Sequence, residues 1–114
     1  MPPKFNPLKL NPLQLRTLTL LQEIARHPEL ATHDPDTGEA EILHIPHPHG
    51  DHFHIGSAAV HASDATGLAN PAVWVALQRK GLTRGEFPAR LTLTAAGMAY
   101  DTGLADKILH GSDH

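Results

Sequence analysis

The sequence of 114 residues contains no cysteine, which excludes a disulfide framework and any metal site built from thiolates. Aromatic residues make up only 4% of the chain, so the core has to be built from leucine, isoleucine, valine and alanine. Apolar runs extend over a few residues at most, and we therefore expect no membrane-spanning segment. The start, Met1-Pro2-Pro3-Lys4, lacks the apolar segment of a secretion signal, and we expect a cytoplasmic protein.

Charge is also scarce. Charged residues account for 18% of the chain, and the formal net charge is −3 when the histidines are neutral. This balance is not the basic excess typical of nucleic-acid-binding proteins. The 10 histidines qualify that argument, because protonating several of them at about pH 6 would make the net charge positive. The length predicts one domain with a modest core.

The first helix is predicted to begin at Pro12, because Asn11 can cap it and Gln14 stands at the partner position of a capping box. Leu15 falls outside the apolar stripe and is a candidate for contact with a partner chain. Pro28 is expected to end the helix just before it. The stripe at helical spacing comprises Leu13, Leu18, Leu20, Leu21, Ile24 and Ala25.

A hairpin is predicted in the next part of the chain. Residues 31–38 are dense in turn formers and are expected to be a loop. Residues 39–45 and 52–55 are then expected to be two strands joined by a short loop. The register that we predict puts His44 opposite His52 and Leu43 opposite Phe53, which gives one histidine face and one apolar face.

A pair of helices and a pair of strands follow. Residues 57–63 are predicted to form a short helix, with a turn at Gly67 and a second helix over residues 71–80. Asn70 is expected to cap the second helix, with Pro71 in its first position. Its buried positions are expected to be Val73, Ala76 and Leu77, with Trp74 also in the core. Two short strands are then predicted at Leu82-Thr83 and Ala89–Leu93.

Lys80-Gly81-Leu82 after the second helix and Leu93-Thr94-Ala95-Ala96-Gly97 after the last strand resemble winged-helix regulators. The resemblance implies an α+β, winged-helix-like fold of three or four helices with a small antiparallel β wing. Winged-helix domains often have one short strand where this chain has its histidine-rich hairpin, so the hairpin is an elaboration. A final helix capped by Thr94 and running through Leu109 is expected, and such helices often mediate homodimers.

The expected organisation is an extended N-terminal arm at residues 1–10, a single winged-helix-like domain at 11–110 and a tail at 111–114. The predicted hairpin occupies residues 39–56 within that domain.

The winged-helix resemblance implies DNA as a partner. Recognition helices read bases mainly from their first turns, where Asn70 is already expected to serve as a cap. The outward face of the helix, around Val75, is otherwise apolar, and a few cations support only weak, salt-sensitive binding. The alternative is a winged helix that binds a protein partner through this face near Trp74. The candidate nucleic-acid contacts are Asn70, Gln78, Arg79, Lys80, Arg84 and Arg90.

Histidines are concentrated in residues 44–54. His49-Gly50-Asp51-His52-Phe53-His54 has the form His-x-x-His-x-His and resembles the zinc-binding motif of bacterial histidine-triad surface proteins. Neutral imidazole is a common ligand of zinc and nickel, and Asp51 could orient one ring. We predict a zinc or nickel site; the alternatives are a polar face without resident metal and a pH-responsive face. The predicted ligands are His44, His49, His52 and His54.

Catalysis is not expected, because the chain has no Gly-rich phosphate loop, no His-Glu-x-x-His motif and no nucleophile elbow. Three functions stay open. The first is a DNA-associated transcriptional regulator modulated by metal at the hairpin. The second is a protein-interaction module without DNA recognition, and the third is a zinc- or nickel-binding accessory protein.

Overall fold

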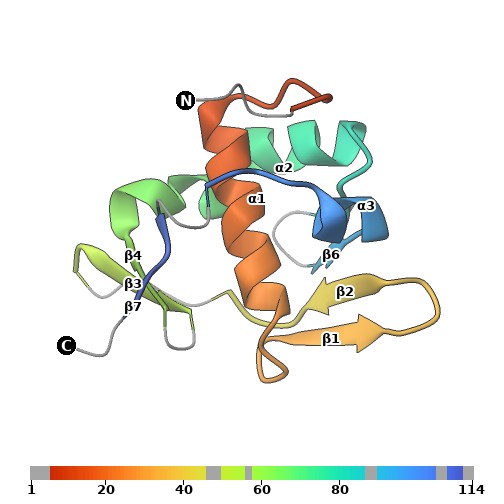
Figure 1. The fold of residues 1–114 in the computed structure, drawn as a ribbon, viewed down its shortest axis with the longest axis horizontal. Coiled ribbons are helices and arrows are strands. Elements are labelled where there is room, and N and C mark those ends of the chain that lie inside the picture. The colour runs from red at the N-terminus through yellow and green to blue at the C-terminus, as the bar shows by residue number, and fades with distance from the viewer. Residues whose placement is uncertain (1–5, 46–49, 56–57, 87–89, 105–107, 112–114) are drawn as a thin grey trace.

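The computed structural model describes residues 6–45, 50–55, 58–86, 90–104 and 108–111. They form a compact α+β fold in which α1 lies between two small antiparallel sheets (Figure 1). The elements in chain order are α1 (Pro12–Ala25), β1 (Ala31–Asp34), β2 (Glu39–Ile42), β3 (His52–Ile55), β4 (Ala58–His61), the 3₁₀ helix η1 (Ala62–Ala69), α2 (Pro71–Arg79), β5 (Thr83–Glu86), β6 (Arg90–Leu93), α3 (Ala95–Ala99) and β7 (His110–Gly111).

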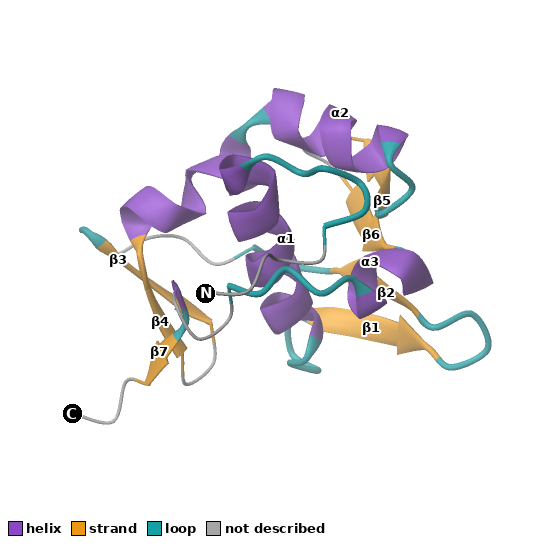
Figure 2. Cartoon of the chain, turned by 45° about the horizontal axis from the view of Figure 1, so that its top comes forward, coloured by secondary structure: helices purple, strands orange, loops and turns teal. Residues whose placement is uncertain are grey.

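The four-stranded sheet has the order β1-β2-β6-β5, and the three-stranded sheet has the order β3-β4-β7. Figure 2 shows α2 and α3 on the side of the four-stranded sheet, while β3, β4 and β7 lie beyond η1. The α+β class predicted from the sequence is confirmed. Within the described ranges, no helix is long and apolar enough to cross a bilayer.

The first helix begins as predicted. The backbone N–H of Gln14 donates to Asn11 Oδ1 at 2.7 Å, and the N–H of Asn11 donates to Gln14 Oε1 at 3.1 Å, which completes the capping box. Leu15 is partly buried and packs against the core of its own chain. Most of the predicted stripe is fully buried, namely Leu18, Leu20, Leu21, Ile24 and Ala25.

The second helix also follows the prediction. Asn70 Oδ1 accepts from the N–H of Ala72 at 3.0 Å, and Pro71 occupies the first turn. Gly81 adopts φ 76°, a left-handed conformation that glycine tolerates, and this ends the helix. Val73 and Leu77 are buried and Ala76 is partly buried. Trp74 belongs to the core, where its Nε1–H donates to the carbonyl of Leu68 at 3.0 Å.

The predicted pair of strands after α2 is present, since β5 and β6 are antiparallel with Thr83 opposite Leu93. Leu91 and Leu93 are buried as the alternation predicted, and Arg90 is exposed. Thr92 is buried too, because β6 is an inner strand with β2 on one side and β5 on the other.

The predicted hairpin between residues 39–45 and 52–55 is wrong. Residues 31–34, expected to be loop, instead form β1, and β1 pairs with β2 across the turn at residues 35–38. The strand at 52–55 pairs with β4 in the other sheet, with His52 opposite His61. Alternation of apolar and polar residues identifies a strand but not its partner. Here β2 pairs with β1, the strand before it, and β3 pairs with β4, the strand after it.

The predicted helix at 57–63 is also wrong, because residues 58–61 form β4 and the helical turns begin only at Ala62. Pairing with β3 buries Ala59 and Val60, whereas a helix of so few residues would have a costly nucleus. Gly67, the predicted turn residue, lies within η1 against α1. A Cβ at this position would come within 1.8 Å of Thr17 Oγ1, so only glycine fits.

The last predicted helix is much shorter than expected. Thr94 caps it as predicted, since its Oγ1 accepts from the N–H of Gly97 at 3.1 Å. The helix ends at Ala99, because Tyr100 is extended at φ −67° and ψ 127° and Gly103 has a positive φ of 69°. His110–Gly111 then pairs with β4 as β7, so the helix predicted to run through Leu109 is wrong.

Residues 6–10, expected to belong to an extended arm, fold back onto the domain. The hydroxyl of Tyr100 donates to Asn6 Oδ1 and accepts from the N–H of Leu8 at 3.2 Å. Leu10 is buried in the core. Residues 1–5 and 112–114, predicted as arm and tail, lie outside the described residues.

Candidate functional site

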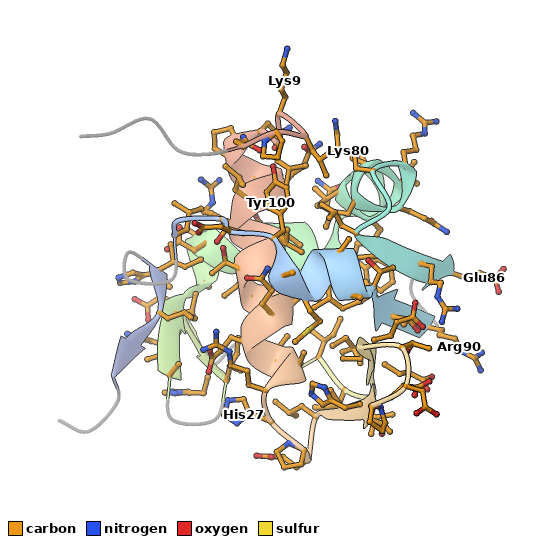
Figure 3. The ribbon with its side chains drawn as sticks, turned by 45° about the vertical axis from the view of Figure 1, so that its right-hand side comes forward. Lys9, His27, Lys80, Glu86, Arg90 and Tyr100 are labelled. Atoms are coloured by element: carbon orange, nitrogen blue, oxygen red, sulfur yellow. The ribbon has the colours of Figure 1, made fainter. Side chains whose placement is uncertain are left out.

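The predicted nucleic-acid contacts on α2 are mostly engaged within the fold. Asn70 caps the helix, and Gln78 Nε2 donates to the carbonyl of Gly85 at 3.2 Å. Lys80 Nζ donates to the carbonyl of Leu8 at 2.7 Å, and Figure 3 shows Lys80 beside the N-terminal segment. Arg79 is exposed on the last turn of α2, and no hydrogen bond or ion pair joins its side chain to another described residue.

The two wing arginines are paired with carboxylates of β2. Arg84 makes a two-point contact with Glu39, of which the Nε–Oε2 bond measures 3.2 Å. The hydrogen bond that Arg84 donates to Glu39, together with the negative charge of that carboxylate, raises the pKa of Arg84 above its usual value. Arg90 Nε lies 3.7 Å from Glu41 Oε2, and Figure 3 shows the Arg90 side chain projecting outward.

These pairs belong to the outer face of the four-stranded sheet, where acidic groups outnumber basic ones. Cross-strand register puts Asp34 beside Glu39, Glu41 in line with Arg84 through Thr92, and Glu86 beside Arg90. A shallow hollow of about 170 Å³ lies on this face. The hollow is lined by Thr32, His33, Asp34, Glu39, Glu41, Arg84 and Thr92. We call this surface the acidic sheet face.

A second hollow of about 180 Å³, which we call the Leu43 groove, lies between the end of β2, β6 and α2. Leu43 is 57% exposed there, which sequence reasoning missed because it assigned Leu43 to the apolar face of a hairpin. Arg90 lines the groove and also pairs with Glu41 on the acidic sheet face, so the two surfaces adjoin. The groove is lined by Ile42, Leu43, His44, Ile45, Trp74, Arg90 and Leu91.

Val75 is the other large apolar side chain that is exposed among the described residues, at 44%. The helical projection of α2 predicted this outward position, and the burial of Val73 and Leu77 on the opposite side agrees with it.

The predicted histidine ligands are distributed over two regions. His44 follows β2 and lines the Leu43 groove, whereas His52 and His54 lie in β3 on the other side of α1. The predicted pairing of His44 with His52 is therefore wrong, and His49 lies outside the described residues. His52 and His54 do share a face of their strand, as predicted.

Sequence reasoning missed His61, which β4 brings directly opposite His52. The two imidazole centroids are 5.9 Å apart. The run Ala58-Ala59-Val60-His61 does not alternate and is as compatible with a strand as with a helix, so the sequence carried no clear signal for this neighbour. In the described ranges, no group of three or more histidine, aspartate or glutamate side chains is already gathered for metal coordination.

Comparisons with known proteins add no relative. No protein family model matches the chain, and neither the curated proteins nor the solved structures contain a match. The functional argument therefore rests on the geometry of the two surfaces and of the histidine pair.

Proposed function

We propose that this chain is a non-enzymatic, winged-helix-like module that binds a protein partner through the Leu43 groove and the acidic sheet face. The element order is consistent with that architecture, since α1, β2, η1, α2 and the β5–β6 hairpin follow one another and β2 adjoins β6. In this interpretation β2 corresponds to the single strand that precedes the helix-turn-helix of a winged-helix domain, and η1 corresponds to the first helix of that motif.

The observation that carries the proposal is the internal pairing of the cations a winged helix would offer to phosphates. Arg84 and Arg90 are neutralised by Glu39 and Glu41, and Lys80 is bound to a backbone carbonyl. A duplex would have to disrupt these contacts and approach additional carboxylates, whereas its affinity depends on uncompensated positive charge.

The partner that fits is a peptide segment with an apolar side chain flanked by lysine or arginine. The apolar side chain would enter the groove beside exposed Leu43 and remove this leucine from water. The basic side chains would meet the acidic sheet face, which adjoins the groove at the Arg90–Glu41 pair. Complementary charge of this kind contributes mainly to specificity and association rate.

Selection of a random peptide display library on the immobilised chain tests the proposal. We expect enriched peptides to combine one large apolar residue with flanking basic residues, and Leu43→Glu and Glu41→Lys to abolish their binding. Val75→Glu is the matched control, because it introduces the same charge at an exposed apolar position away from the groove lining. Enriched peptides that bind Leu43→Glu as well as the parent chain would contradict the proposed surface.

DNA association is the second candidate function, and Arg79 favours it. This arginine is the last residue of α2 and is exposed near the turn that leads into the β5–β6 hairpin, where a winged helix could contact a phosphate. Fluorescence anisotropy with a labelled random duplex at low and physiological salt tests this candidate. Binding that weakens steeply with salt and is lost in Arg79→Ala would favour DNA over the peptide partner. Absence of binding at low salt would eliminate this candidate.

A further inference from the structure

The outer face of the three-stranded sheet carries a cross-strand histidine pair. His52 of β3 and His61 of β4 are direct neighbours in the register, and both are exposed. The opposite face of the same strands contributes Ile55 and Val60 to the core, at 0% and 1% exposure. The imidazoles are therefore held on the solvent side of strands whose other side is anchored.

The tautomer of His52 is set by its neighbour. Asp51 Oδ1 lies 2.7 Å from His52 Nδ1, and because a carboxylate can only accept, the proton lies on Nδ1. This leaves the Nε2 lone pair available for a ligand. Asp51 is itself anchored, since its carbonyl accepts from the N–H of Ala62 at 2.9 Å. A carboxylate that orients a histidine in this way is typical of the surroundings of metal ligands.

The spacing of the two rings suits one shared ion. With Zn–N distances of about 2.1 Å, two imidazoles on a tetrahedral zinc have centroids roughly 5 Å apart. The observed centroids are 5.9 Å apart, so a small side-chain rotation would bring both nitrogens to one ion. His54 lies on the same face of β3, two residues from His52, and is exposed, so its imidazole is the third one on this side of the sheet.

We propose that His52 and His61 are the primary ligands of a divalent transition-metal site, with His54 as the third donor and Asp51 orienting His52. Zinc, nickel and copper are the ions that imidazole donors favour. The site does not depend on the proposed peptide-binding function, because the Leu43 groove belongs to the other sheet. It also differs from the ligand set expected from the sequence, since it includes His61 and excludes His44.

Isothermal titration calorimetry of the full chain, without an affinity tag, with zinc chloride and nickel chloride tests the site. We expect one site per chain, lost in His52→Ala and in His61→Ala. Asp51→Asn should weaken binding about tenfold, as removal of an orienting carboxylate typically does. His44→Ala is the matched control, an exposed histidine outside this sheet, and should bind like the parent chain.

Parent-like affinity in His61→Ala would overturn the proposal, as would absence of binding in the parent chain or an equal loss in His44→Ala. Circular dichroism of each variant separates lost ligands from lost folding. If His61→Ala does not fold, the site is tested in the parent chain by NMR of the imidazole nitrogens. Zinc should shift Nε2 of His52 and leave its Nδ1 protonated, and unchanged His52 and His61 resonances would overturn the site.

Discussion

The two sheets of this protein use their solvent faces differently. The four-stranded sheet carries opposite charges that pair across strands, as Arg84 does with Glu39 and Arg90 with Glu41. The three-stranded sheet carries imidazoles, which are neutral donors with a lone pair when unprotonated. The two sheets lie on opposite sides of α1 (Figure 1).

The difference shows that residue type at the surface is informative only once its cross-strand neighbour is known. An arginine that a carboxylate of another strand reaches is compensated and offers little to a phosphate. A histidine opposite another histidine forms a pair that one ion can bridge. In both sheets the neighbour comes from a different strand, so the chemistry of each face depends on strand pairing.

The largest expected effect comes from disturbing the packing of η1, the helix that directly follows β4, on α1. Gly67→Ala would force a Cβ against Thr17 Oγ1, and we expect a loss of roughly 3 kcal/mol in the free energy of unfolding, the upper part of the range for overpacking. Chemical denaturation measures the loss, and hydrogen exchange should show β3 and β4 losing more protection than β2 and β6.

A double-mutant cycle supplies the control for this prediction. Thr17→Ala removes the hydroxyl that the new methyl group would meet, so Gly67→Ala should cost less in the Thr17→Ala background. Equal costs in both backgrounds would show that contact with Thr17 is not the cause.

A smaller loss of stability is expected when the hydrogen bond between Thr102 and Thr19 of α1 is removed. Thr102 is buried, and its hydroxyl lies 2.6 Å from that of Thr19 on α1. Thr102→Val keeps the shape and removes the hydrogen bond, and should cost about 1 kcal/mol in the free energy of unfolding. Thr19 keeps its bond to the carbonyl of Leu15. Thr102→Ser, which retains the hydroxyl, is the control, and a Val variant as stable as the parent in urea titration would refute the role of this bond.

The smallest change in stability is expected in the four-stranded sheet. Glu39→Gln removes the charge that pairs with exposed Arg84, and the midpoint of thermal unfolding should stay close to that of the parent chain. Its effect should instead appear in binding, because Arg84 becomes uncompensated. Duplex affinity at low salt, measured by anisotropy, should rise more than in Glu86→Gln, which removes an equal charge from the same face. Equal affinities in the two variants would contradict the role of pairing.

The parts of the fold that could be predicted are those fixed by neighbours in the chain. The capping box of Asn11 and Gln14, the Asn70 cap and the Thr94 cap are hydrogen bonds over two or three residues, and each was found at the predicted place. The β5–β6 hairpin was predictable for a similar reason, since its strands adjoin along the chain. The outward position of Val75 followed from helical periodicity alone.

The parts that failed depend on partners far away or on competing local structures. Residues 58–61 could form a helix or a strand, and pairing with β3 decided for the strand. The end of α3 at Ala99 lets Tyr100 reach Asn6 at the other end of the chain, a contact that no local pattern encodes. The candidate ligand His61 was missed for this reason, because a helix at 57–63 would have separated it from His52.

The sequence alone thus determined where α1, α2 and α3 begin, the α+β class and the lack of a net positive charge. Only the tertiary structure decided which strands are neighbours, and with them the pairing of arginines with glutamates and of His52 with His61. The physical reason is range: capping and helical periodicity act within one turn of chain. Strand pairing is selected by the burial of apolar faces against α1, which involves residues throughout the chain.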